Sequence, residues 1–585
     1  MLFSRLIHAG FTHDIEFKRR RTSDNELERR IAFMNMFSVG GRNEIIPFLD
    51  GLVAWCPPAA RYLASVCTRS FLERLYLLVE SVKEVIETRI SICEWVVTHG
   101  IRDNETISEE REALMRELSN LDARSDLDST RVHVDEESLH DWYNETQRAN
   151  ERRYKQTVLA EGAASIHGTF LDFYNSSREM PTPADDVEDL LADTQIGSEF
   201  ILLNIVEATL NAFINDKTFG LDSYLSRRIR HGTLRGILAT PIARIRSRLT
   251  SDIENEERAA ERQRLQIVAK HFDEWIEFFS ERLDYLRREV IQVYSDERPN
   301  GLIRATWRNA INVTHLDAMM TRTRSRVVES RGHYDIFSDV FLLCWDFLEP
   351  DLAHLRRHIY HEFNNELMSK LDEIYNDMQY HVRVIAVGYW NEVAAVLSGR
   401  AQEVCGWFIR PVFRRDAYDV KTLVESTISI IRELDEGYSF QERVNIPDNL
   451  LINRGTFDVL GDILFVLIGN AAKHGKRGGI VDIIAAVVGE SDSLIRIDIG
   501  SEVKDKFALM EAEARIRQAA GVQDLAQILS AGVDEGFSGI RKLIGLLSRT
   551  KNTSTSCAVK FDDDRLFVIW HVVVPLTIAF ARERT

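Results

Sequence analysis

The chain has 585 residues, of which 45% are hydrophobic and 28% charged, and its formal net charge is −18. This length is too great for one hydrophobic core, so we expect several domains of ordinary soluble composition. The acidic balance excludes general coating of nucleic acid, although it permits a local basic site. The six cysteines are scattered without a C-x-x-C pair. This argues against a disulfide framework or a structural zinc site and favours a reducing cytoplasm.

Four regions are predicted along the chain. Apolar residues recur at three- and four-residue spacing from about residue 42 to 415, which indicates helices almost throughout. Residues 103–156 are highly charged, so they form either an exposed helical arm or a poorly ordered connection. Pro181 and Pro183 mark a break between two helical bundles. The predicted regions are an N-terminal helical region at 1–180, a central bundle at 181–350, a helical hairpin at 351–415 and an α/β domain at 416–585.

A long amphipathic helix is predicted to begin at Ser251, because Ser251 and Glu254 have the spacing of a capping box. Apolar residues then follow in alternating steps of four and three, as in a heptad seam. We interpret the seam as the buried face of a helix in a bundle, and a coiled-coil contact with a second chain is the alternative. The seam residues are Leu265, Ala269, Phe272, Ile276, Phe279, Leu283, Leu286, Val290 and Val293.

An arginine-rich segment is the most anomalous stretch of this acidic chain, because no acidic residue lies between Asp222 and Asp252. Gly232 and Pro241 interrupt its helical pattern. Guanidinium groups bind phosphates and carboxylates through two nitrogens at once. The segment is therefore either a site for a phosphate-bearing ligand or a nucleic-acid end, or it neutralises acidic helices nearby. The candidate anion-binding residues are Arg227, Arg228, Arg230, His231 and Arg235.

Strands and helices alternate after about residue 415, which indicates an α/β layer. The elements are predicted from period-two and period-3.6 patterns of apolar residues. In chain order they are a helix at 420–434, a strand at 439–446, a helix at 457–474, strands at 479–488 and 494–499, helices near 505–530 and 538–549, and strands at 556–561 and 566–577.

The predicted helix at 457–474 carries Asn470, followed by Ala-Ala-Lys473-His474-Gly475. This motif resembles the N-box of the GHKL ATPases, the superfamily of the histidine-kinase, gyrase and heat-shock-chaperone ATP sites. The resemblance implies an α/β sandwich in which Asn470 holds Mg²⁺ against the phosphates of ATP, a role that suits a carbonyl oxygen. Lys473 and His474 lie one turn further along the same face, where we expect them to reach phosphate oxygens.

Two further motifs extend the resemblance. Asp498-Ile-Gly500-Ser-Glu502 is similar to the D-x-G-x-G box, whose aspartate accepts a hydrogen bond from the adenine amino group, but Glu502 replaces the second glycine. Residues 535–543 resemble the G2 box, in which glycine lets backbone amides approach phosphates, although Arg541 stands where a second glycine is expected. The candidate nucleotide-binding residues of these motifs are Asp498, Gly500, Gly536, Ser538, Gly539 and Lys542.

Two observations bear on the chemistry of the predicted nucleotide site. Val466 stands where the gyrase and chaperone branches place a glutamate that activates water, and an apolar side chain cannot accept a proton. We therefore expect slow hydrolysis or none. Upstream, His361-Glu362-Phe-Asn-Asn resembles the phosphoacceptor H-box of histidine kinases. That resemblance implies that His361 receives the phosphoryl group while Glu362 acts as the base.

Three functions remain open on the sequence. The first is a nucleotide-gated switch, in which ATP–Mg²⁺ closes a lid at 501–535 and changes how the helical part packs or pairs. The second is a cytoplasmic histidine-kinase-like phosphotransferase, and the third is a degenerate scaffold that binds a phosphate-bearing ligand or nucleic acid through the arginine segment. We expect ATP and Mg²⁺ as cofactors and a homodimer or protein partner. No membrane association is expected, because the most apolar stretches, 200–214 and 463–472, are too short to span a bilayer.

Overall fold

The computed structural model divides the chain into two compact units, Met1–Ser125 and Asp126–Thr585. The boundary between them falls within one helix, α7. Each unit has its own apolar core or cores. The structure describes residues 41–75, 78–79, 81–100, 104–129, 131–161, 197–230, 233–411, 417–434, 440–448, 450–488, 494–504, 554–562 and 565–575.

The described part of unit 1 is helical, and ion pairs join its charged last helix to the others. Arg69 binds the Glu117 carboxylate through two nitrogens, at 2.6 and 2.9 Å. Arg89, which is buried, binds both oxygens of Glu110 at 2.8 and 2.7 Å. Residues 104–129 of the predicted arm form a helix, and these ion pairs hold it against its neighbours. The elements are η1 (Gly41–Glu44), α3 (Ile45–Trp55), α4 (Pro57–Val66), α5 (Arg69–Leu72), α6 (Val82–Thr98) and α7 (Asn104–Ser129).

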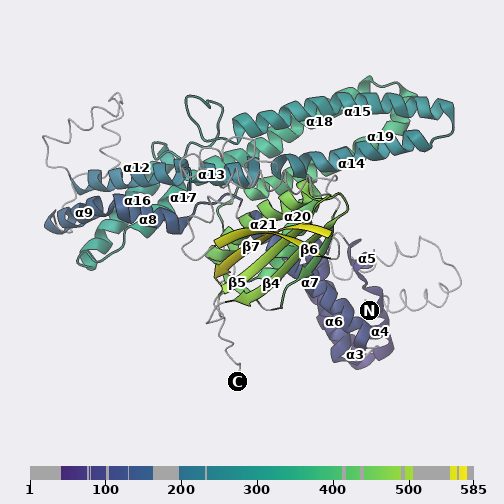
Figure 1. Ribbon diagram of the computed structural model, residues 1–585, viewed down its shortest axis with the longest axis horizontal. Helices are drawn as coiled ribbons and strands as arrows, with labels where there is room; N and C mark the ends of the chain where they lie inside the picture. Colours follow the sequence, from purple (N-terminus) through teal and green to yellow (C-terminus); the bar gives the residue numbers. More distant parts are fainter. Residues whose placement is uncertain are drawn as a thin grey trace. The chain divides into compact units, whose positions relative to one another are not determined.

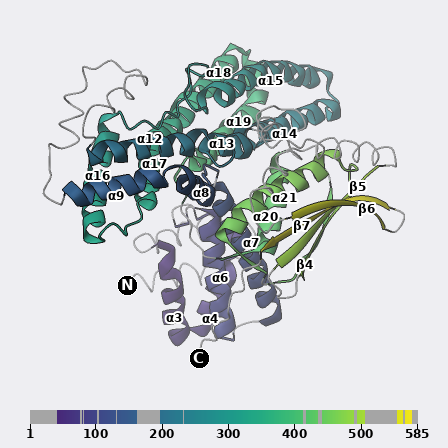
Figure 2. The same cartoon turned by 60° about the vertical axis from the view of Figure 1, so that its left-hand side comes forward.

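Unit 2 begins with a large helical body, whose single core runs from Val132 to Phe408. In this body α14, α15, α18 and α19 pack together as a bundle, and α12, α16 and α17 pack with α8 and α9 (Figures 1 and 2). Its elements are α8 (Glu136–Thr146), α9 (Arg148–Glu161), α12 (Ser198–Asn215), α13 (Leu221–Leu225), η2 (Ser226–Arg230), α14 (Thr233–Asn255), α15 (Ala259–Tyr285), η3 (Leu286–Val290), α16 (Ala310–Glu329), α17 (Phe337–Arg357), η4 (His358–Phe363), α18 (Asn364–Asp377) and α19 (Tyr380–Trp407). The segments η2, η3 and η4 are π-helical.

The predicted heptad seam runs along α15 and η3 to Val293, and its residues are buried inside the chain except Ile276, which is half-buried. Phe272 and Phe279 are almost fully buried, and the neighbouring Trp275 fills the same core. The predicted start at Ser251 is wrong, because α14 continues to Asn255 and α15 begins at Ala259. The apolar face of α14 is buried up to Leu249, so tertiary packing outweighs the local capping signal.

The C-terminal part of unit 2 is an α/β domain with a separate core. Its five-stranded sheet has the order β2-β4-β5-β7-β6, in which β2 pairs parallel to β4 and the other pairs are antiparallel. The helices α20 and α21 lie on one face of this sheet (Figures 1 and 2). The elements are β1 (Ala417–Asp419), α20 (Val420–Leu434), β2 (Gln441–Asn445), β3 (Leu451–Asn453), α21 (Arg454–His474), β4 (Ile480–Val488), β5 (Leu494–Glu502), β6 (Ser554–Asp562) and β7 (Arg565–Pro575).

The predicted class of a large helical region followed by a C-terminal sheet with helices is confirmed at this level. The predicted boundary at residue 350 falls inside α17, and the predicted helices near 505–530 and 538–549 lie outside the described residues. Among the helices that the structure describes, α21 alone is long and apolar enough to cross a membrane. Half of the apolar stretch of α21 is buried within the protein, as in a core helix.

Candidate functional site

The predicted N-box is the C-terminal half of α21. Asn453 caps this helix by accepting a hydrogen bond from the Thr456 amide at 2.8 Å. Its apolar face packs on the sheet, which leaves Asn470 half-buried and Lys473 and His474 exposed near the helix end. Together these three side chains offer a carbonyl oxygen, an ammonium group and an imidazole within just over one turn.

The turn after α21 is fixed by close backbone contacts. A Cβ atom at Gly475 would lie 2.4 Å from the Ala471 carbonyl oxygen and 2.6 Å from Ser501 Oγ, so glycine is required there. Glu502, at the end of β5, is buried and accepts hydrogen bonds from Lys476 Nζ at 2.7 Å and from the Ile480 amide at 3.0 Å. The glutamate that departs from the D-x-G-x-G pattern therefore holds this turn against the sheet.

Asp498 of the predicted adenine box points away from α21. Ile497 and Ile499, on either side of it, face the core beneath α21, so alternation along β5 places Asp498 on the opposite face of the sheet. There it accepts a hydrogen bond from His571 Nδ1 at 2.7 Å and pairs with Arg496 Nε at 3.2 Å. Asp498 and Asn470 are thus on opposite sides of β5.

The remaining parts of the predicted nucleotide site are only partly described. Gly500 is buried in β5, opposite Asp482 of β4. Val466, at the position of the water-activating glutamate, lies half-buried on α21. The predicted lid beyond residue 504 and the residues Gly536, Ser538, Gly539 and Lys542 lie outside the described residues.

The predicted phosphoacceptor lies on the π-helical turn η4, between α17 and α18. Ile359 and Phe363 anchor this turn in the core, and His361 is exposed beside the ring of Tyr360. Glu362 pairs with His358, whose Nδ1 lies 2.7 Å from Glu362 Oε2. The predicted base is therefore engaged by a histidine other than His361.

Internal contacts engage most of the predicted anion-binding arginines. Arg227 donates to the Thr218 carbonyl oxygen at 3.2 Å and stacks over the Tyr224 ring. Arg230, which is buried, binds Asp222 at 2.7 Å. The contact of Arg230 fits the alternative that the arginines neutralise nearby acids, whereas Arg227 contacts a backbone carbonyl and an aromatic ring. Of the other two candidates, Arg235 is exposed on α14, and His231 lies outside the described residues.

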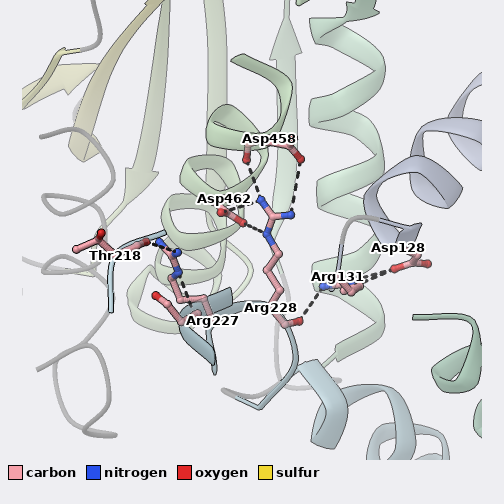
Figure 3. Close-up of polar contacts among 8 residues, drawn as sticks. Asp128, Arg131, Thr218, Arg227, Arg228, Asp458 and Asp462 are labelled. Carbon is pink, nitrogen blue, oxygen red and sulfur yellow. Dashed lines mark hydrogen bonds and ion pairs between the residues drawn. The ribbon is translucent and has the colours of Figure 1, made fainter. Parts of the chain in front are cut away.

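Arg228 joins the helical body to α21 (Figure 3). Its Nε and Nη2 atoms bind the two oxygens of Asp462 at 2.8 and 3.0 Å, and its Nη1 lies 3.6 Å from Asp458 Oδ1. Burial lowers the pKa of this guanidinium, but the two carboxylates more than offset that effect, so its pKa is raised and it stays charged. Burial raises the pKa of Asp458 to about 6, against the opposing attraction of Arg228.

A second arginine holds the first in place. Arg131 Nη1 donates to the Arg228 carbonyl oxygen at 3.1 Å, and Arg131 also binds Asp128 at 2.9 Å (Figure 3). The same guanidinium lies over the ring of Trp407, the last residue of α19, at 5.0 Å. We call Arg228, Asp458, Asp462, Arg131 and Trp407 the arginine junction.

Sequence reasoning missed most of this junction. Asp458 and Asp462 are spaced i, i+4 on a helix that is otherwise strongly apolar. Buried carboxylates require partners. The spacing of the two aspartates could therefore have predicted a cationic partner, but it could not have shown which residue that partner is. Arg228 lies 234 positions from Asp462 in the chain. His571 was missed because its role depends on strand register.

Both parts of unit 2, the helical body and the α/β domain, are similar to known proteins. The family model Y4jQ matches residues 136–408, nearly the same stretch as the core of the helical body. The chain is 22% identical over 503 residues to the Detocs histidine-protein kinase DtcA of Vibrio alginolyticus, which covers 86% of this chain and 47% of that protein. It is 26% identical over 183 residues to the uncharacterized protein y4jQ of Sinorhizobium fredii (strain NBRC 101917 / NGR234), covering 28% of this chain and 16% of that protein. The chain thus spans less than half the length of either relative.

Proposed function

We propose that this chain is a histidine-kinase-like phosphotransferase, in which the α/β domain binds ATP–Mg²⁺ at α21 and His361 receives the phosphoryl group. The similarity to a protein named a histidine-protein kinase carries the proposal, because it covers 86% of this chain. Alignment of that extent includes parts of both the helical body and the α/β domain. The sheet with α20 and α21 on one face supports a GHKL-type nucleotide domain.

The chemistry of the exposed end of α21 suits a magnesium nucleotide. The side-chain carbonyl of Asn470 is a hard oxygen donor of the kind Mg²⁺ takes, and Lys473 is exposed to meet phosphate oxygens. Bound Mg²⁺ would neutralise charge on the phosphates. Val466 supplies no base for water, so the site suits transfer or retention of the phosphoryl group better than hydrolysis.

The transfer step needs a nucleophile and a proton acceptor. The unprotonated ring nitrogen of His361 attacks the γ-phosphorus, the bond from that phosphorus to the bridging oxygen breaks, and ADP leaves. The other ring nitrogen then gives its proton to a base. The proposed base is Glu362, the next residue in the chain, which must first leave His358. His361 is exposed on a π-helical turn, a form of helix frequent at functional sites.

Radiolabelling tests the proposal. The protein is incubated with γ-labelled ATP and Mg²⁺, as wild type and as His361→Gln, His354→Gln and Asn470→Ala. We expect an acid-labile, base-stable label that His361→Gln abolishes and Asn470→Ala reduces. His354 is a matched control because it is an exposed histidine in the same continuous helical segment. A label that survives His361→Gln would contradict the assignment of the acceptor.

A nucleotide-gated switch without transfer is the second candidate, because the apolar Val466 disfavours hydrolysis and is compatible with retention of bound ATP. Calorimetry with ATP and Mg²⁺ separates the two functions. Binding that Asn470→Ala weakens, in the absence of any label, supports the switch. No binding heat and no thermal stabilisation would contradict both and leave a helical scaffold.

A further inference from the structure

We propose that Arg228 is a positioning residue, which sets where α21 lies on the helical body and couples that position to α19. That Arg228 holds α21 in position, the mechanical part of this inference, follows from the contacts of the arginine junction alone. Its consequence for phosphoryl transfer rests on the proposed function. The two parts are tested by different measurements.

Arg228 holds α21 through buried contacts with two aspartates. Arg228 is 8% exposed and Asp458 9%, so their charges are screened little by solvent. Two-point binding to Asp462 fixes the direction as well as the distance of the contact. Arg228 Nη2 also donates to the Asp458 backbone carbonyl at 3.4 Å. Without Arg228, two carboxylates one turn apart on α21 would lose the guanidinium that compensates their charge.

Arg228 is itself anchored in the helical body. Arg228 belongs to η2, and its own carbonyl oxygen is held by Arg131. Arg131 in turn lies over Trp407, which is 1% exposed at the end of α19. A displacement of Arg228 therefore alters contacts at the end of α19.

Packed elements connect the arginine junction with both proposed reactive positions. α19 packs against α18 and against η4, which carries His361. On the other side, Asn470 is eight residues from Asp462 along α21, a rise of about 12 Å in a rigid helix. The arginine junction thus lies on a continuous path of packed elements between the nucleotide helix and the phosphoacceptor turn. Such a path transmits a change only if the two sites favour different positions of α21.

The test uses the full chain with the substitutions Arg228→Gln and Arg228→Lys, and with Arg246→Gln as the matched control. Arg246 also binds a carboxylate through two nitrogens, because its Nε and Nη2 atoms lie 2.6 and 2.9 Å from the oxygens of Asp273. This pair differs from the Arg228 pair in that it is exposed and joins α14 to α15. The conservative Arg228→Lys keeps the charge and loses the two-point geometry.

Hydrogen exchange without nucleotide tests the mechanical part. We expect Arg228→Gln to raise the exchange of amides in α21 and in the last turns of α19 by about tenfold or more, as the local opening equilibrium shifts. Arg246→Gln should leave both regions at wild-type rates. Equal exchange in the two variants would overturn the inference, whatever the protein does with ATP. If Arg228→Gln does not fold, Asp462→Asn keeps Arg228 and Asp458 and provides the milder variant.

Nucleotide measurements test the consequence for transfer. We expect Arg228→Gln and Arg228→Lys to keep the Kd for ATP within about threefold of wild type and to slow single-turnover labelling of His361 by about tenfold. A residue that only stabilises the fold would not separate binding from transfer in this way, so an equal loss of both contradicts positioning. If wild type shows no label, the proposed transfer fails while the exchange result still decides whether the junction holds α21.

Discussion

Asp498 and His571 form a hydrogen bond of 2.7 Å between β5 and β7, on the face of the sheet that α21 does not cover. The two residues are register partners, so their side chains share that face. An aspartate in this position stabilises the pairing of two strands. It is separated by the sheet from Asn470, which the resemblance to GHKL ATPases assigned to the same nucleotide.

This geometry gives a prediction for Asp498→Asn. We expect the affinity for ATP to change by no more than about twofold, or about 0.4 kcal/mol, because the side chain points away from α21. Asn470→Ala should weaken binding by about tenfold or more, about 1.4 kcal/mol. Calorimetry of both variants makes the comparison. A large loss of affinity in Asp498→Asn would place the base of the nucleotide on the outer face of the sheet.

Glu502 gives a prediction about stability. Glu502→Ala removes a buried side chain and leaves the half-buried Ile480 amide without this acceptor, so we expect a loss of about 1–3 kcal/mol in the free energy of unfolding. Urea unfolding followed by circular dichroism measures it. The control is Arg443→Ala, which removes a cross-strand pair between Asp482 and the exposed side chain of Arg443 and should cost less than about 1 kcal/mol. Equal losses would show that Glu502 does not hold the turn.

Local patterns of apolar residues predicted much of the α/β domain, because its helices and strands each bury one face. The predicted helix at 420–434 has the bounds observed for α20, because its apolar stripe begins and ends with the helix. The strands β4 and β5 were also predicted, through alternation on a half-covered sheet. The contacts that hold α21 could not be predicted in the same way. Arg228 and Asp462 are far apart in sequence, and no local period relates them.

Gly236 is a second position whose role depends on a contact distant in the sequence. α14 passes through it, and a Cβ there would lie 2.7 and 2.9 Å from side-chain atoms of Leu434 in α20. We expect Gly236→Ala to cost about 1–3 kcal/mol by forcing the two helices apart. Gly399→Ala is the control, since nothing lies within 4 Å of that Cβ in α19, and it should stabilise by about 0.5–1 kcal/mol. Thermal unfolding of both variants tests the opposite signs.

The raised pKa of Asp458 predicts a pH dependence. Burial is the main cause, the neighbouring Asp462 adds to it, and Arg228 and Arg454 oppose it. Because the folded state binds this proton more tightly than the unfolded state, the carboxyl contributes stability below about pH 4 that is lost as the pH rises through about 6. The loss amounts to about 2–3 kcal/mol at neutral pH.

Asp458→Asn isolates this contribution. We expect the unfolding free energy of wild type to fall relative to that of Asp458→Asn between pH 4 and pH 7, as measured by urea unfolding at several pH values. Parallel curves across this range would mean that Asp458 keeps an ordinary pKa in the folded protein.

The π-helical turn η4 lies in an unbroken helical path from α17 to α18. A π-helical turn contains one residue more than the α-helical path requires. Removing a residue from an ordinary helix rotates every later side chain by about 100° about the axis. Removing one from η4 would instead restore an ordinary helix and keep the buried faces of α17 and α18 aligned. This turn is therefore a place where the chain can shorten by one residue, and change which side chain it presents to solvent, while its core stays in register.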